Sequence, residues 1–176
     1  MPTALTLTTT TPDQTRVVGA ALGRLVPPRT VILLHGDLGA GKTTLAQGIA
    51  QGLGVPGPVQ SPTFTLANEH DGIRDGAPIR LYHLDLYRLA GEGDLDGVGW
   101  DAYLAAADGV TVVEWPERAG SALPEAYWLV RLEDTGDGGR RLTFSEVPSV
   151  ARSAPWLATL ASEVAGFPAR RSDSEG

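Results

Sequence analysis

A single lysine, Lys42, stands at the end of a glycine-rich run, Gly36-Asp37-Leu38-Gly39-Ala40-Gly41-Lys42-Thr43-Thr44, and all other basic residues of the 176-residue chain are arginine. The run has the spacing G-x-x-x-x-G-K-[ST] of a phosphate-binding loop. An ammonium on a flexible stem can fold over a tight loop and contact phosphate oxygens, whereas the wider guanidinium cannot. Backbone N–H groups of such a loop hold the phosphates, and the hydroxyl of Thr43 would contact Mg2+. The run therefore predicts a nucleoside triphosphate site.

Two acidic residues end apolar runs further along the chain. Asp85 follows the run 79–84 and Glu114 follows the run 110–113, and open α/β sheets bind ligands at the carboxyl ends of their strands. A phosphate loop needs a carboxylate for Mg2+ and a group that orients water. We expect at least one of the two acids to serve the metal. The sequence leaves open which one, and a strand-ending acid can also cap a helix or meet solvent.

Three nearby residues each have a structural and a functional interpretation. Thr63, in Ser61-Pro62-Thr63-Phe64, occupies the kind of connection where switch segments of nucleotide hydrolases sense the γ-phosphate, but a proline-led entry to a strand explains it equally well. His83 is interpreted as a hydrogen-bonded core histidine. Trp115, directly after Glu114, belongs either to the core or a lid, or to a partner interface.

Periodicity and capping residues place the elements that must hold these groups. Thr11-Pro12-Asp13-Gln14 has the form of a capping box and predicts a helix that ends at Pro27-Pro28. A buried strand at 30–34 feeds the loop, and the helix after the loop runs to about Leu53. The later elements are expected to be strands at 63–70, 79–84 and 110–113, with a turn at 71–76, a short helix at 100–107, and an antiparallel hairpin of 127–133 and 140–146 at a sheet edge.

Strands and helices mixed around a phosphate loop predict an α/β fold. We expect a three-layer domain like that of P-loop NTPases over residues 1–147, with a mixed sheet that is parallel at its centre and has antiparallel additions. Residues 148–176 are expected to form a C-terminal extension, with a short helix at 156–164 followed by a disordered tail.

Composition excludes several classes of protein. The net charge is −7 and the chain has no cysteine, so strong direct binding to nucleic acid, disulfides and thiolate metal sites are not expected. No apolar run approaches a membrane span and the N-terminal segment lacks an export signal, which predicts a cytoplasmic protein. A guanine-specific switch protein is disfavoured because its Asn-Lys-x-Asp motif needs a second lysine.

Four segments in series closely resemble the TsaE family, also called YjeE. They are Gly36 to Thr44, Ser61-Pro62-Thr63-Phe64-Thr65-Leu66, His83-Leu84-Asp85-Leu86-Tyr87-Arg88-Leu89 and Glu114-Trp115-Pro116-Glu117. The resemblance spans residues 11–144. It implies an ATPase, slow on its own and dependent on partners, that acts with the TsaB and TsaD proteins in N6-threonylcarbamoyladenosine modification of tRNA.

The resemblance also implies roles for particular residues. Lys42 and the loop amides would hold the ATP phosphates, and Thr43, Asp85 and Glu114 would manage Mg2+. Thr63 would lie in the switch-like segment. The family's adenine pocket draws on the N-terminal segment and the late hairpin, which makes Thr11 and Arg140 candidates there. The resemblance implies no role for the segment after Pro148.

Two other functions are compatible with the same residues. A small-molecule P-loop kinase would suit the chain length and the loop, although no substrate pocket or arginine-bearing lid can be located. A regulatory module would bind ATP to order a switch and dock on a partner, with hydrolysis incidental.

Overall fold

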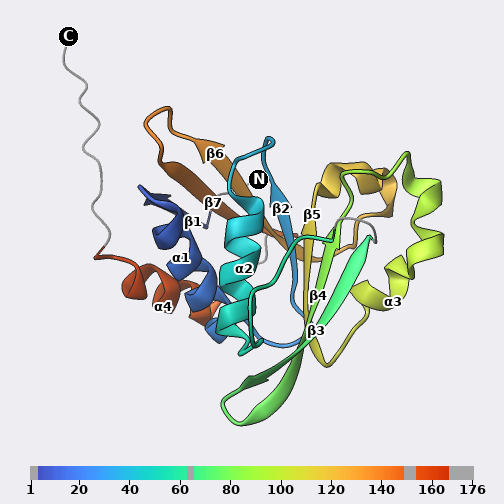
Figure 1. Cartoon of the computed structure of the whole chain (residues 1–176), viewed down its shortest axis with the longest axis horizontal. Coiled ribbons are helices and arrows are strands. Elements are labelled where there is room, and N and C mark those ends of the chain that lie inside the picture. The colour runs from blue at the N-terminus through green and yellow to red at the C-terminus, as the bar shows by residue number, and fades with distance from the viewer. Residues whose placement is uncertain (1–3, 63–65, 149–153, 167–176) are drawn as a thin grey trace.

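The computed structural model describes residues 4–62, 66–148 and 154–166, and these form a mixed α/β sheet flanked by helices (Figure 1). The sheet has seven strands in the order β1-β7-β6-β2-β5-β4-β3. The strands are β1 (Leu5–Thr9), β2 (Val31–His35), β3 (Ala67–Arg74), β4 (Ala77–Asp85), β5 (Gly109–Glu114), β6 (Tyr127–Asp134) and β7 (Arg140–Val147). The helices are α1 (Pro12–Leu25), α2 (Lys42–Gly52), α3 (Trp100–Leu104) and α4 (Pro155–Glu163), with short 3-10 helices at Glu92–Asp94, Asp96–Val98 and Pro116–Ala122.

The centre of the sheet is parallel, as the sequence predicts. Strand β2 pairs in parallel with β5 and β6, and β4 pairs in parallel with β5. The outer pairs, β1 with β7, β7 with β6, and β3 with β4, are antiparallel. The carboxyl ends of β2, β5 and β4 therefore meet at one edge of the sheet, where the glycine loop follows β2.

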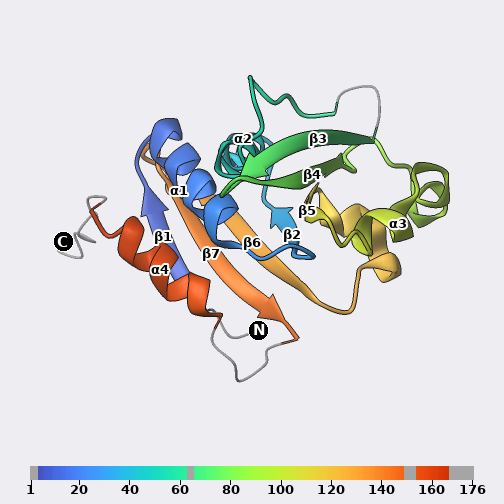
Figure 2. The same ribbon diagram turned by 90° about the horizontal axis from the view of Figure 1, so that it is seen from below.

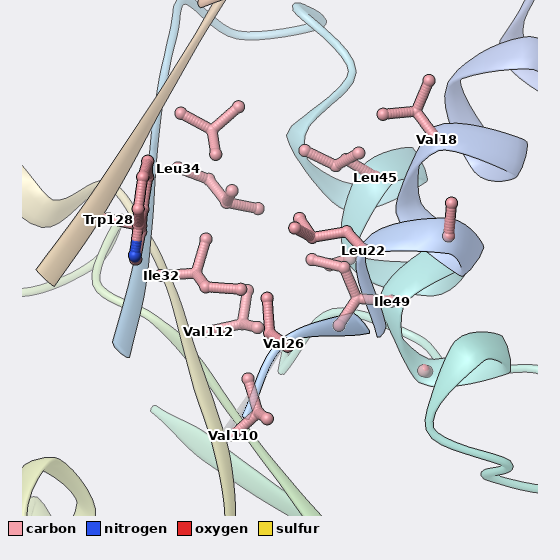
Figure 3. Close-up of a cluster of buried hydrophobic side chains, with 14 of the residues drawn as sticks. Val18, Leu22, Val26, Ile32, Leu34, Leu45, Ile49, Val110, Val112 and Trp128 are labelled. Atoms are coloured by element: carbon pink, nitrogen blue, oxygen red, sulfur yellow. The ribbon is translucent and has the colours of Figure 1, made fainter. Parts of the chain in front are cut away.

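Alternation along the buried strands creates two apolar layers. Ile32 and Leu34 of β2 face α1 and α2 (Figure 3), whereas Val31 and Leu33 face a second cluster that includes Trp100 of α3. Because strand side chains alternate, one strand can pack on helices at both faces. Figure 2 shows the result from below, with α4 and β1 far from α3.

Helices α1 and α2 approach each other at glycines. A Cβ added at Gly19 of α1 would lie 2.4 Å from the carbonyl oxygen of Leu45, and one added at Gly48 of α2 would lie 2.3 Å from that of Arg16. Gly23 and Gly52, one turn further on, make the same kind of contact. The backbones therefore touch without intervening side chains, which fixes α2 closely on α1.

The start of α1 agrees with the predicted cap. The hydroxyl of Thr11 accepts a hydrogen bond from the backbone N–H of Gln14 at 3.2 Å. The side-chain oxygen of Gln14 accepts one from the N–H of Thr10 at 2.7 Å, one residue before the position expected in a capping box. Both contacts satisfy N–H groups near the beginning of the helix.

The expected position of the late hairpin at a sheet edge is wrong. Strand β6 pairs with β2, and β7 is covered by β1, with Leu5 opposite Phe144 and Leu7 opposite Leu142. Strand β1 gives no clear signal in the sequence, because this five-residue run of leucine and threonine alternates too briefly to stand out. Its leucines pack against the core, so β1 itself forms the edge.

The first hairpin has a shorter turn than expected. Residues 71–74 belong to β3, and only Asp75 and Gly76 form the turn, both with positive φ (52° and 79°). Gly72 is a point of close approach, because an added Cβ there would lie 2.2 Å from the carbonyl oxygen of Leu53. Helix α3 is also shorter than predicted and ends at Leu104.

Helix α4 packs on the sheet and on α1. Leu160 is fully buried in the larger core cluster, and the rings of Trp156 and Trp128 meet edge to face with centroids 4.8 Å apart. Arg24 of α1 contacts Glu163 at 2.9 Å on the exposed side. Among residues 4–62, 66–148 and 154–166, no helix combines the length and apolar character that crossing a membrane would require.

Candidate functional site

The glycine loop joins the end of β2 to the first residue of α2. Gly41 is the N-cap of α2 with φ 102°, a backbone conformation that favours glycine. At Gly36, an added Cβ would lie 2.6 Å from the carbonyl oxygen of Leu132. Helix α2 begins directly after Gly41, and its first N–H groups have no partners inside the helix.

Lys42 folds back over this loop. Its side chain is only 5% exposed, and its Nζ donates to the carbonyl oxygens of Gly36 and, at 3.1 Å, of Asp37. Loss of hydration lowers the pKa of Lys42, although the nearby carboxylates of Glu114, Glu117, Asp85 and Asp37 oppose this shift. The ammonium is thus held in place by loop carbonyls and surrounded by acids.

Asp85 and Glu114 lie opposite each other at the ends of neighbouring parallel strands. The register of β4 and β5 pairs Asp85 with Glu114. Burial raises the pKa of Asp85, and the charge of Glu114 adds to this effect, while a hydrogen bond from the N–H of Tyr87 opposes it. The structure therefore brings together the two acids that the sequence left as alternatives.

Glu114 is 2% exposed and is surrounded by hydrogen-bond donors. The hydroxyl of Thr43 lies 3.0 Å from its Oε1, the hydroxyl of Ser61 lies 3.2 Å from its Oε2, and Nε2 of His83 lies 2.6 Å from Oε2. Burial acts to raise the pKa of Glu114, but the hydrogen bond and charge of His83, with help from the two hydroxyls, outweigh burial and lower it. Glu114 is consequently a carboxylate at neutral pH.

One pocket of about 340 Å³ connects these groups. Its lining consists of Leu38, Gly39, Ala40, Gly41, Lys42, Thr43, Thr44, Ser61, Asp85, Tyr87, Glu114 and Trp115. A smaller cavity of about 90 Å³ also borders the loop, and Thr11 and Arg140 line it together with Gly39, Gly41 and Thr44. A guanidinium nitrogen of Arg140 lies 3.0 Å from the carbonyl oxygen of Gly39. The two residues from distant segments are therefore both beside the loop.

Thr63 lies outside the described residues. Ser61, two residues earlier, was not singled out by sequence, although it contacts both Thr43 (2.9 Å) and Glu114. A lone serine before a proline carries no signal of such a role. His83 is a buried, hydrogen-bonded histidine as interpreted, and its partner is Glu114.

The donor chemistry of the pocket suits a divalent cation bound with phosphate. No group of three or more His, Cys, Asp or Glu side chains within the described residues could hold a metal ion alone. Mg2+ prefers oxygen ligands and usually combines one or two protein groups with waters and phosphate oxygens. Thr43, Asp85 and Glu114 offer such oxygens beside a loop with free N–H groups.

Comparison with known proteins identifies relatives over most of the chain. A family model described as "Threonylcarbamoyl adenosine biosynthesis protein TsaE" matches residues 9–142. Proteins named tRNA threonylcarbamoyladenosine biosynthesis protein TsaE are similar to this chain. The Bacillus subtilis protein is 37% identical over 139 residues, which are 79% of this chain and 84% of the relative. The Streptomyces coelicolor protein is 41% identical over 132 residues, which are 73% of this chain and 87% of the relative.

A solved structure has the same fold. The crystal structure of YdiB from Bacillus subtilis superposes with a TM-score of 0.66 at 30% sequence identity, and the match covers 92% of this chain and 93% of that chain.

Proposed function

The chain belongs to the TsaE family, and on that premise we propose that it binds ATP with Mg2+ at the glycine loop and hydrolyses it in support of tRNA N6-threonylcarbamoyladenosine synthesis. The observation that carries this proposal is the convergence of Lys42, Thr43, Asp85 and Glu114 on one pocket, although they come from three separate segments of the chain. A glycine loop alone would bind phosphate without cleaving it. The two acids supply what hydrolysis also requires.

The loop residues 36–44 bind the phosphates of ATP in this proposal. The N–H groups at the start of α2 face the negative charge, and Lys42 contacts the phosphates nearest the bond that breaks. Its ammonium is already at the loop, held by the carbonyls of Gly36 and Asp37. The lysine would exchange these carbonyls for phosphate oxygens, which form stronger, charge-assisted bonds.

Thr43, Asp85 and Glu114 would hold Mg2+, and one of the two acids would orient the attacking water. When Mg2+ is bound it offsets the charge that develops on the phosphate oxygens. Thr43 can donate its proton to Glu114 and still offer oxygen lone pairs to the ion. Asp85 is half-buried and lines the same pocket.

The adenosine part lies toward the smaller cavity. Thr11 and Arg140 border it beside Gly39 and Gly41, and the planar guanidinium of Arg140 could stack on a base. This assignment predicts that substitution of Arg140 weakens the binding of ATP and of ADP to the same extent, because both carry the same base.

The partners in this proposal are the TsaB and TsaD proteins, which would carry out the transfer to tRNA. The net charge of −7 argues against strong binding of this chain to RNA by itself. The relatives' names connect the family with tRNA modification, so contact with tRNA is expected to pass through the partners. A cytoplasmic location stays a prediction.

The test combines purified chain, TsaB and TsaD proteins, tRNA and ATP. We expect wild type to cleave ATP and to support many rounds of modification, whereas Lys42→Ala and Glu114→Ala stop both. The control is Arg24→Gln, which removes an exposed ion pair with Glu163 far from the pocket and should behave as wild type.

Three results would contradict the proposal in different ways. Absence of ATP binding by the folded wild type would remove the nucleotide site. Phosphoryl transfer to a metabolite faster than to water would make the chain a kinase. If both variants supported repeated tRNA modification as well as wild type, hydrolysis would be dispensable and the chain would be a regulatory binding module.

A further inference from the structure

His83 is a fully buried side chain that the proposed reaction has not used. It lies in β4 two residues before Asp85, and its exposed fraction is 0%. Its Nε2 is 2.6 Å from Oε2 of Glu114, and its Nδ1 has no hydrogen-bond partner among residues 4–62, 66–148 and 154–166. The imidazole therefore has one directed polar contact, and that contact is to the proposed site's carboxylate.

We propose that His83 is a positioning residue whose Nε2–H donates to Oε2 of Glu114 and thereby holds the other oxygen, Oε1, toward Thr43 and the pocket. This inference rests on the proposed function, in which Glu114 serves the Mg2+ and water side of ATP hydrolysis. His83 itself would touch neither the nucleotide nor the metal.

The direction of this hydrogen bond follows from the surroundings of Glu114. Three donors surround the carboxylate, namely Thr43 at Oε1 and both Ser61 and His83 at Oε2. An ionised carboxylate only accepts hydrogen bonds, so the proton between His83 and Glu114 belongs to Nε2.

The imidazole is the most rigidly placed of the three donors. It is a ring on β4, an interior strand that pairs with β3 and with β5, where His83 lies opposite Val112. Ser61 lies before β3 in a segment outside the helices and strands, and Thr43 would turn toward a bound cation. A ligand carboxylate usually depends on such an outer hydrogen bond for its orientation. Removal of His83 should therefore disturb Glu114 more than the loop.

The test separates a donor role from simple packing. His83→Leu keeps an apolar side chain in the buried position and removes the donor, whereas the amide of His83→Gln can present an N–H at about the place of Nε2. We expect His83→Leu to lower kcat about 10- to 100-fold with ATP affinity unchanged, because Lys42 and the loop amides remain. His83→Gln should recover most of the rate. Arg24→Gln, which removes an exposed ion pair with Glu163 outside the pocket, should match wild type.

Two kinetic outcomes would overturn the proposal. One is a His83→Leu variant that turns over like wild type. The other is a His83→Gln variant that is as slow as His83→Leu, because a donor role demands that the amide rescue the rate. Thermal unfolding curves must show that both variants are folded.

A second readout needs no nucleotide. Nitrogen-15 NMR of the imidazole in the free protein should show a slowly exchanging proton on Nε2 of His83, and Glu114→Gln should shift this resonance. A proton found on Nδ1 with Nε2 bare would overturn the proposal whatever the ATPase activity. If wild type neither bound nor cleaved ATP, the proposed function would fail, while the NMR result would still decide whether His83 holds Glu114.

Discussion

Nζ of Lys42 lies 3.7 Å from the centroid of the Trp115 ring, so the ammonium at the glycine loop is covered by an indole face. Trp115 follows Glu114 with a positive φ of 59°, which turns the chain sharply at the end of β5. Its ring also meets that of Tyr87 at 4.9 Å. A cation–π contact of this kind contributes about 0.5–2 kcal/mol. Phosphate must therefore compete with both the loop carbonyls and Trp115 for the same ammonium.

The competition predicts a fluorescence signal. Addition of ATP and Mg2+ should change the emission of Trp115, because its charged neighbour moves toward phosphate. The measurement is the difference in emission between wild type and Trp115→Phe on titration with nucleotide. Trp100, Trp128 and Trp156 belong to the apolar clusters and provide a constant background. An equal change in emission in the Trp115→Phe variant would show that the signal does not come from Trp115 beside Lys42.

Replacement of Lys42, even by arginine, should weaken nucleotide binding. Loss of a hydrogen bond to a charged group costs about 1.5–3 kcal/mol, which corresponds to at least about a tenfold rise in Kd. Lys42→Ala removes the charge. Lys42→Arg keeps it, but the planar fork does not fit the space between the loop carbonyls and Trp115. Calorimetric titration with ATP and Mg2+ gives the affinity of each variant, and an arginine variant as tight as wild type would contradict this prediction.

The two site acids should affect stability in opposite directions as pH falls. The pKa of Glu114 lies below its ordinary 4.5 in the folded protein, so its ionised form stabilises the fold above pH 4.5 and this contribution is lost on further acidification. The pKa of Asp85 lies above its ordinary 3.8, so its charge opposes folding at neutral pH and this penalty disappears on acidification.

Denaturant unfolding of wild type, Glu114→Gln and Asp85→Asn between pH 7 and pH 3 measures these opposite contributions to stability. Relative to wild type, Glu114→Gln should be less stable at neutral pH and should lose that disadvantage below pH 4.5. Asp85→Asn should be more stable at neutral pH and should lose its advantage as Asp85 becomes protonated in wild type. Parallel pH profiles for the three proteins would contradict the opposite shifts.

Gly48→Ala should destabilise the protein although alanine is the better helix former. Alanine gains about 1 kcal/mol in helix propensity, but its Cβ would lie 2.3 Å from a backbone oxygen of α1. A backbone atom cannot rotate away, so α1 and α2 must separate, at a cost of typically about 1–3 kcal/mol from overpacking. The control is Gly93→Ala, where no atom lies within 4 Å. Thermal and denaturant unfolding compare them, and a more stable Gly48→Ala would show that the helices can adapt.

Local sequence was sufficient for most elements around the site. The cap at Thr11, the loop from Gly36 to Thr44 and the buried run before Glu114 each depend on neighbouring residues, and their positions agree with the structure. Predictions were weaker where pairing partners are distant. Strand β1 has only five residues of weak alternation, and its existence depends on the open side of β7 more than 130 residues away in the chain.

The sequence by itself determined a phosphate-type loop between a strand and a helix, two acids at strand ends, and membership of one family. The tertiary structure decided which groups meet. The register between β4 and β5 places Asp85 beside Glu114. The buried charge of Glu114 is stabilised by hydrogen bonds from Thr43, Ser61 and His83. Such contacts depend on strand order and on packing across 18 to 71 residues of chain, and no local pattern of residue types specifies them.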